Sequence, residues 1–361
     1  MSIKNFGKSN HRGRSRGTWN VGCWTLFFFL CGSIFCTVSS AEVYYAVGRG
    51  TEKNGTVWQY DAGQWSIHSE IPNCSEVFGL LVDKSGKLYA CGNYYSYCTV
   101  WKFDGHTWDK GTAMPDGRGL YAMVLDKQGN IWVGGTGEKN VWKFDGNKWD
   151  EGTKLNNCIG IYALTVDDKG NVWAGGEGKS QVWCFNGQQW DDGVRLSECT
   201  DVFTLYADKK GTVWAGGRGN KVIWWFNREL EALSGKTTAN SVLPPTTQEK
   251  TDSGIPKWTL GSILLDCSEI SSISQDSQGN LYAAGAGKNK VWIKKSDVDF
   301  WSGINLPECI AVYAIMAGNP VIAGGWNNGK RGRMWSKSGT EWDNGTDIEK
   351  SYVIRSIVAK K

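Results

Sequence analysis

The chain repeats one block of sequence, and the repetition decides which folds are open to it. "LYAMVLDKQGNIWVGG", "IYALTVDDKGNVWAGG" and "VFTLYADKKGTVWAGG" follow one another along the chain. The aspartate inside the block recurs at intervals of 43, 41, 41 and 68 residues, at Asp83, Asp126, Asp167, Asp208 and Asp276. A unit repeated in this way cannot bury its apolar face alone, so neighbouring copies must pack against one another.

A glycine and two tryptophans keep the same order in seven copies of the unit. The glycines are Gly48, Gly92, Gly135, Gly176, Gly217, Gly285 and Gly325; the first tryptophans are Trp58, Trp101, Trp142, Trp183, Trp224, Trp292 and Trp335; the second are Trp65, Trp108, Trp149, Trp190, Trp258, Trp301 and Trp342. Short β-branched and aromatic runs bounded by Asp, Gly and Asn are typical of strands joined by tight turns. A period of about 42 residues with about four strands predicts an all-β protein, a β-propeller. The seven copies predict seven blades.

The two ends of the repeat region are complementary. "VYYAVG" near the N-terminus matches the second strand of the unit, and "YVIRSIVAKK" at the C-terminus matches the first. Pairing these two strands would complete one blade and close the ring, which removes sheet edges that could aggregate.

Residues 1–41 have the pattern of a secretory signal peptide. Five basic residues precede the 18-residue apolar run "VGCWTLFFFLCGSIFCTV", which is followed by "SSA". Small residues at Ser39 and Ala41 predict cleavage before Glu42. The alternative is an uncleaved anchor, because about 18 apolar residues are just enough to span a bilayer. We expect a secreted or periplasmic protein, or otherwise a membrane-anchored one with an exported propeller.

Charge and composition restrict the partners. Lys and Arg total 40 and Asp and Glu total 36, but the first 41 residues supply five positive charges and no negative ones, so residues 42–361 are near −1. A nucleic-acid partner is not expected, since phosphate binding needs a basic surface. Hydrophobic residues at 40% and 21 tryptophans support a single globular domain over 42–361, which we expect to be monomeric. An insertion at about 228–257, rich in Thr, Ser, Pro and Lys, is expected to be disordered and to join the third and fourth strands of the fifth unit.

Eight cysteines follow the N-terminal segment. Five occupy one repeat-equivalent position just before a first strand: Cys74, Cys158, Cys199, Cys267 and Cys309. Equivalent positions are spread around a ring, whereas a disulfide needs Cα atoms about 4.4–6.8 Å apart, so we interpret them as buried thiols. Cys91 and Cys98 flank the turn "GNYYSY" and are candidates for a hairpin disulfide.

The repeat resembles a known family. The "VGG" or "AGG" doublet, the "VWKFDG" strand with the following tryptophan, and "MP" at Met114 and Pro115 resemble kelch-type propellers over residues 42–361. The "DKQG" turn also looks like the propeller repeats of bacterial sensor proteins. The resemblance implies the fold, but kelch-type architecture serves adhesion scaffolds, sugar epimerases and copper oxidases alike, so it implies no single function.

Several motifs suggest a cofactor and are better explained otherwise. "GGTGEKN" resembles a phosphate loop, but no helix pattern follows it. "WDKG", "WDEG", "WDDG" and "WDNG" resemble calcium loops, but Asp beside Gly is typical of turns. Beyond the N-terminal segment the only histidines are His68 and His106, both beside an outermost tryptophan. We therefore expect neither a metal nor another cofactor.

The candidate site consists of positions where equivalent residues differ between copies. Directly after the repeated glycine stand Arg49, Asn93, Thr136, Glu177, Arg218, Ala286 and Trp326. Beyond the repeated cysteine position stand Glu76, Gly119, Gly160, Asp201, Glu269, Ala311 and Tyr352. Both sets are predicted to share one face near the axis, with Tyr94, Tyr95 and Tyr97 as further aromatic surfaces. The ligand-binding candidates are Arg49, Glu76, Tyr94, Tyr95, Glu177, Asp201, Arg218, Glu269 and Trp326.

This site favours a binding module over an enzyme. Charged groups and aromatic faces suit a polar ligand, either a saccharide or a peptide, so a small molecule, a glycan or a protein partner fits. The alternative is a carbohydrate-active enzyme of the epimerase or lyase type that uses Arg49, Arg218, Glu177 and an acid such as Glu76 or Asp201. Ordinary variation of solvated turns would produce the same differences. No residue is singled out as catalytic.

Overall fold

The computed structural model describes residues 42–51, 54–94, 97–179, 181–219, 221–228, 257–288 and 290–360, with only the backbone of Tyr94 and Tyr97. Ala41–Lys361 form one compact unit. The predicted signal segment, Tyr95 and nearly all of the insertion lie outside the described residues. Among the described residues no helix is long and apolar enough to cross a membrane.

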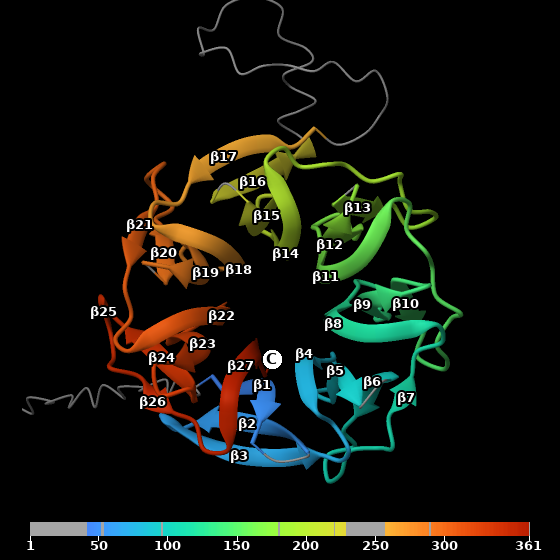
Figure 1. The fold of residues 1–361 in the computed structure, drawn as a ribbon, viewed down its shortest axis with the longest axis horizontal. Helices are drawn as coiled ribbons and strands as arrows, with labels where there is room; N and C mark the ends of the chain where they lie inside the picture. Colours follow the sequence, from blue (N-terminus) through green and yellow to red (C-terminus); the bar gives the residue numbers. More distant parts are fainter. Residues whose placement is uncertain are drawn as a thin grey trace, which may run out of the picture. The chain divides into compact units, whose positions relative to one another are not determined.

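Every element of the described residues is a β-strand, as the sequence predicted, and consecutive strands pair antiparallel into small sheets arranged around an axis (Figure 1). We call each sheet a blade and name it after its innermost strand. The β4 blade consists of β4 (Glu76–Val82), β5 (Leu88–Tyr94), β6 (Tyr97–Lys102) and β7 (Thr112–Ala113); the β8 blade of β8 (Gly117–Leu125), β9 (Ile131–Gly137) and β10 (Val141–Phe144); and the β11 blade of β11 (Cys158–Val166), β12 (Val172–Gly178) and β13 (Val182–Phe185).

The β14 blade consists of β14 (Cys199–Ala207), β15 (Thr212–Gly219), β16 (Val222–Asn227) and β17 (Thr259–Ile263), and the β18 blade of β18 (Cys267–Gln275), β19 (Leu281–Gly287), β20 (Val291–Lys294) and β21 (Ser302–Ile304). The β22 blade consists of β22 (Cys309–Ala317), β23 (Val321–Asn327), β24 (Gly332–Ser338), β25 (Glu341–Trp342) and β26 (Thr346–Asp347).

The remaining blade joins the two ends of the chain, as the sequence predicted. β27 (Ser351–Ala359) is its innermost strand and pairs with β1 (Tyr44–Gly50), which is followed by β2 (Gly55–Asp61) and β3 (Gln64–Ile71). We call it the closing blade. The register runs from Tyr44 opposite Ala359 to Gly50 opposite Ser351. β16 and β17, on either side of the predicted insertion, pair as the third and fourth strands of their blade.

The repeated glycine is required by a close backbone approach. A Cβ on Gly135 would lie 1.9 Å from the carbonyl oxygen of Gly119, and one on Gly176 would lie 1.9 Å from that of Gly160. The positive φ angles occur two residues later, for example 140° at Gly137 and 147° at Gly178. Crowding therefore explains the first glycine, and the left-handed backbone explains the second.

The repeated tryptophans form the core between blades. The first tryptophan of each copy is at most 2% exposed. The indole Nε1 of Trp142 donates to the carbonyl of Pro115, and that of Trp183 donates to the carbonyl of Asn156, so each ring also fixes the segment that enters its own blade. The predicted structural role of the first tryptophans is confirmed by their burial.

The aspartates of the repeat are satisfied by turn hydrogen bonds. Asp126 accepts the backbone N–H of Asn130 at 2.8 Å and the indole N–H of Trp132 at 2.9 Å. In the "WDEG" turn, Asp150 accepts the backbone N–H groups of Lys143 and Gly152. The turn interpretation of these motifs is therefore supported.

All eight cysteines of the described residues are buried free thiols. The bridge considered between Cys91 and Cys98 is not formed. Cys98 lies opposite Asn93, and Cys91 lies opposite Val100, so the two cysteines are diagonal neighbours on one face. Diagonal Cα atoms are about 7–8 Å apart, beyond the usual reach of a disulfide of about 4.4–6.8 Å.

Candidate functional site

The two predicted sets of positions meet at one end of the inner strands. Within blades, Glu76 lies opposite Asn93 and Asp201 lies opposite Arg218. Between blades, Glu177 lies opposite Asp201 and Arg218 lies opposite Glu269. We name the combined set the axial rim: Arg49, Glu76, Asn93, Gly119, Thr136, Gly160, Glu177, Asp201, Arg218, Glu269, Ala286, Ala311, Trp326 and Val353.

One position was placed wrongly from the sequence. Arg49 lies opposite Val353, and Ser351 occupies the repeated cysteine position of the closing blade. Val353, which is 7% exposed, is therefore the counterpart of Glu76. Tyr352 is displaced by one residue and is 48% exposed, because a one-residue shift in a strand reverses the side to which a side chain points.

Arg218 is held by carboxylates on both sides. Its Nη1 lies 3.5 Å from Oδ2 of Asp201, and its Nη2 lies 3.9 Å from Oε2 of Glu269. The guanidinium also lies 5.1 Å from the ring centroid of Phe203. Because the side chain is 59% exposed, this cluster is screened by water and orders the arginine more than it stabilises the fold.

Two further acids of the rim have partners. The Tyr162 hydroxyl donates to Oε2 of Glu177 at 2.8 Å. Burial of the phenol, reinforced by this carboxylate, raises the pKa of Tyr162 well above its usual value. The Arg355 Nε donates to Oε1 of Glu76 at 3.0 Å. Glu76, Glu177, Asp201 and Glu269 are thus all engaged by the protein itself.

A layer of aromatic rings, not predicted from the sequence, lies next to the rim. We name Phe78, Tyr121, Tyr162, Phe203 and Tyr313 the aromatic belt. Successive ring centroids are 5.1, 5.3 and 5.7 Å apart from Phe78 to Phe203, mostly edge to face. Together with Ser271 and Arg355, they line a cavity of about 180 Å³ formed by all the inner strands.

The signal for this belt is present in the sequence. Each member stands four residues after the repeated cysteine position, and Ser271 and Arg355 occupy that place in the β18 and closing blades. Arg355 continues the belt electrostatically, because its guanidinium lies 4.6 Å from the centroid of Tyr313 and 5.6 Å from that of Phe78. Because Ser271 and Arg355 are polar, this repeat position does not serve packing alone.

Arg49 lines a separate cavity of about 400 Å³ between the β22 blade and the closing blade. We name it the Arg49 pocket; its lining residues are Arg49, Tyr313, Trp326, Lys330, Tyr352, Val353 and Arg355. The Arg49 guanidinium lies 6.0 Å from the ring centroid of Tyr352. Within the described residues, neither Arg49 nor Lys330 belongs to an ion pair.

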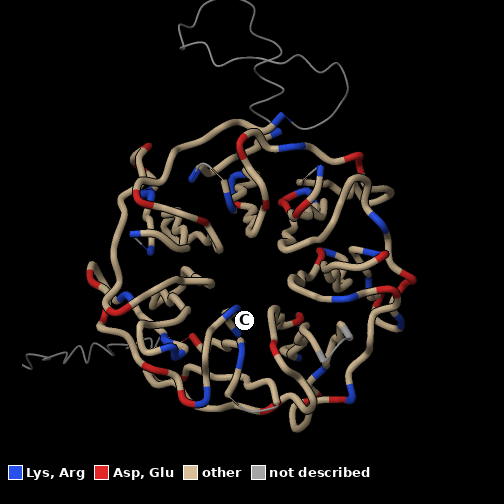
Figure 2. The backbone as a smooth tube through the Cα atoms, viewed as in Figure 1, with Lys and Arg blue, Asp and Glu red and all other residues tan. Residues whose placement is uncertain are grey.

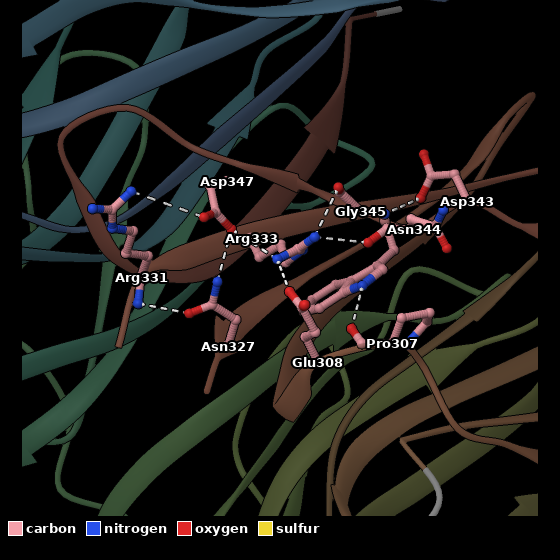
Figure 3. A network of polar contacts seen from close by, with 10 residues as sticks. Pro307, Glu308, Asn327, Arg331, Arg333, Asp343, Asn344, Gly345 and Asp347 are labelled. Atoms are coloured by element: carbon pink, nitrogen blue, oxygen red, sulfur yellow. Dashed lines mark hydrogen bonds and ion pairs between the residues drawn. The ribbon is translucent and has the colours of Figure 1, made fainter. Parts of the chain in front are cut away.

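A polar network holds the β23–β24 hairpin in place (Figure 3). Nη1 of Arg333 lies 2.6 Å from Oε2 of Glu308 and 3.1 Å from Oδ1 of Asp347. Asn327 donates its amide to the same Asp347 oxygen at 2.7 Å and accepts the backbone N–H of Arg331. The network therefore holds the β23–β24 hairpin, which presents Trp326 and Lys330 to the pocket.

The other predicted residues gain less support. Tyr94 lies in β5, with only its backbone described, and Tyr95 lies outside the described residues.

Charges of both signs are distributed around the ring (Figure 2). No group of three or more His, Cys, Asp and Glu within the described part of the chain could hold a metal ion.

Comparison with solved structures identifies the architecture. Virginiamycin B lyase from Staphylococcus aureus matches with a TM-score of 0.58 at 13% identity, covering 75% of this chain and 84% of that one. A 6-phosphogluconolactonase-like protein from Bacteroides fragilis matches with a TM-score of 0.62 at 10% identity over 90% and 99%. The WD40 repeats of RRP9 match with a TM-score of 0.53 at 12% identity, covering 78% of this chain and 82% of that one. The chain has a β-propeller fold.

No family model and no curated protein matches the sequence. The propellers above include enzymes and repeat domains, and at about 10% identity the likeness extends to the fold alone. Function in this propeller therefore has to be argued from its own axial residues.

Proposed function

We propose that this chain is an exported propeller with kelch-type or sensor-type repeats that binds a polar ligand, a saccharide or a peptide, over the axial rim. The seven repeat copies support seven blades, and the basic and apolar pattern of residues 1–41 supports export. The observation that carries the binding role is the stacking of a charged rim upon a belt of aromatic rings at the axis.

The rim and the belt together have the properties of a binding site. Aromatic faces bind the apolar faces of sugars or peptide side chains, and charged groups fixed by neighbours orient hydroxyl or amide groups. The rim side chains are held before any ligand arrives, for example Arg218 by Asp201 and Glu269, so ordering them on binding costs little.

The test is binding to a broad panel of immobilised glycans and peptides. Tyr121→Ala, in the belt, should weaken any specific binding about tenfold, since aromatic contacts contribute about 0.5–1.5 kcal/mol beyond the area they bury. His106→Ala, in an exposed hairpin of the β4 blade, serves as the matched control and should change nothing. Specific binding that is equally strong in Tyr121→Ala and wild type would contradict an axial site.

A second candidate is a carbohydrate-active enzyme of the lyase or epimerase type. The observation in its favour is the hydrogen bond between Tyr162 and Glu177, because a phenol beside a carboxylate is a pair that can move a proton. Mass spectrometry of a bound saccharide distinguishes the candidates. Unchanged ligand after long incubation supports the binding module, and a product that Tyr162→Phe no longer forms supports the enzyme.

A further inference from the structure

Two arginines occupy the same repeat position and have different surroundings. Arg218 lies between Asp201 and Glu269. Arg49 lies opposite the apolar Val353, and Glu76, which has the rim position in the next blade that Glu269 has beside Arg218, is engaged by Arg355. Among the described residues Arg49 is thus a rim cation without a carboxylate partner, and Lys330 shares its pocket in the same condition.

The rest of this pocket consists of three aromatic residues, Val353, and Arg355, whose guanidinium is engaged by Glu76. Trp326, Tyr313 and Tyr352 line the same cavity as the two cations, and Tyr352 is 48% exposed. A volume of about 400 Å³ is within the range of small-ligand sites, which runs from about 300 to 1,000 Å³. Two unpaired cations beside three aromatic faces suit a ligand that combines an anionic group with a ring.

We infer that the Arg49 pocket binds the carboxylate of an acidic saccharide, with a hexuronate residue seated between Arg49 and Lys330 and its ring against the aromatic faces. This inference rests on the proposed axial binding function and specifies its ligand class. The guanidinium can give the carboxylate two parallel hydrogen bonds, and the ammonium adds a third.

The remainder of the rim favours a saccharide over an acidic peptide. Beyond the pocket the rim presents four carboxylates, Glu76, Glu177, Asp201 and Glu269. These oxygens accept hydrogen bonds from hydroxyl groups but repel further anions. A ligand with one carboxylate and many hydroxyls matches this pattern, whereas a peptide with several acidic side chains does not.

The position of Lys330 is set by the hairpin that carries it. Its backbone is left-handed, with φ of 59°, and its N–H donates to the carbonyl of Asn327 at 3.1 Å. Asn327 is in turn tied to Asp347. Because this network fixes the hairpin, the backbone of Lys330 is held beside the pocket before a ligand arrives.

The decisive experiment compares oligosaccharides ending in a hexuronate with the same oligosaccharides carrying the methyl ester of that carboxylate. Calorimetric titration of full-length protein should show the free acid binding at least tenfold more tightly than the ester. Arg49→Ala and Lys330→Ala should each remove roughly tenfold to a hundredfold of the affinity for the acid and leave the affinity for the ester unchanged.

Lys288→Ala is the matched control. Lys288 is an exposed cation in the corresponding hairpin of the β18 blade, and it lies outside the Arg49 pocket. Its removal changes the net charge equally, so an effect as large as that of Arg49→Ala would mean long-range attraction and would overturn the inference.

The remaining outcomes are also decisive. Equal binding of acid and ester, both weakened by Tyr121→Ala, overturns the carboxylate inference and leaves the axial function standing. Arg49-dependent binding of acidic peptides with no binding of either saccharide also overturns it. Loss of dependence on Tyr121 in every ligand that binds contradicts the axial function itself.

Discussion

The contribution of β27 to the stability of the propeller can be tested by replacing one of its buried side chains and the equivalent side chain of another blade. Ile354 in β27 is 0% exposed, and its Cγ2 atom lies 2.7 Å from where a Cβ on Gly324 of the neighbouring blade would be. Ile161 in β11 is also 0% exposed, with its Cγ2 atom 2.4 Å from the corresponding point on Gly134. The two isoleucines therefore fill equivalent spaces between blades.

Replacing either residue with alanine removes three carbon atoms from this space. At about 0.8 kcal/mol for each buried carbon, the lost transfer free energy is about 2.4 kcal/mol, and an unfilled cavity of about 60 Å³ would add about 1.4 kcal/mol. We expect Ile354→Ala and Ile161→Ala each to lower the free energy of unfolding by about 2–4 kcal/mol. Guanidinium unfolding followed by tryptophan fluorescence measures the loss.

The two variants should differ in one respect. Among the described strands β27 pairs only with β1, which lies at the opposite end of the repeat region, whereas β11 pairs with β12, the next strand along the chain. Weakening β27 therefore lets this strand separate locally from its sheet. We expect limited proteolysis to remove the C-terminal segment from Ile354→Ala and not from Ile161→Ala. A loss below about 1 kcal/mol for Ile354→Ala beside the expected loss for Ile161→Ala would refute the closure argument.

Further predictions concern thiols, acid and the insertion. Burial raises the pKa of Cys74 and of Cys158 to about 12, so the described thiols should resist alkylation at pH 8 until the protein is unfolded, as mass spectrometry would show. Burial favours a higher pKa for Asp126, but hydrogen bonds from Trp132 and Asn130 outweigh it and lower the pKa. The carboxylate therefore contributes its full stability above about pH 4, and this contribution is lost as the pH falls further. Asp126→Asn should flatten this part of the acid-unfolding curve. Replacing residues 230–255 with a short turn should leave the melting temperature within about 2 °C of wild type, because the segment has few apolar residues to bury.

The fold could be predicted from the sequence because the same stabilising contacts recur in successive copies of the repeat. The tight contact of Gly135 with the Gly119 carbonyl, the burial of Trp142 and the turn hydrogen bonds of Asp126 each recur from blade to blade. Repetition separates the residues that the fold needs from those that only one blade has. The pairing of β1 with β27 followed in the same way, because each end of the chain carries one part of the unit.

The site was harder to predict because it depends on register at single positions. Tyr352 was assigned to the rim in place of Val353, because Ser351 replaces the repeated cysteine in β27 and no cysteine marks the register there. The aromatic belt was overlooked because aromatic residues inside strands were interpreted as core, and whether a ring faces a neighbouring blade or the axis depends on this alternation. Ion pairing was also hidden, because it joins residues of successive blades, such as Arg218 and Glu269.

The difference between Arg49 and Arg218 is the basis of the inferred anion pocket. Rim residues face a partner in their own blade, and several, including Arg218, also face one in an adjacent blade. The environment of such a side chain is therefore set by two neighbours that vary independently. For Arg218 both neighbours are acids, and the guanidinium is neutralised by the protein. For Arg49 the neighbour in its own blade is Val353, and Arg355 holds Glu76 of the next blade. Arginine at the same repeat position is therefore ion-paired in one blade, as Arg218, and unpaired in another, as Arg49. Only the unpaired Arg49 is available to an anionic ligand.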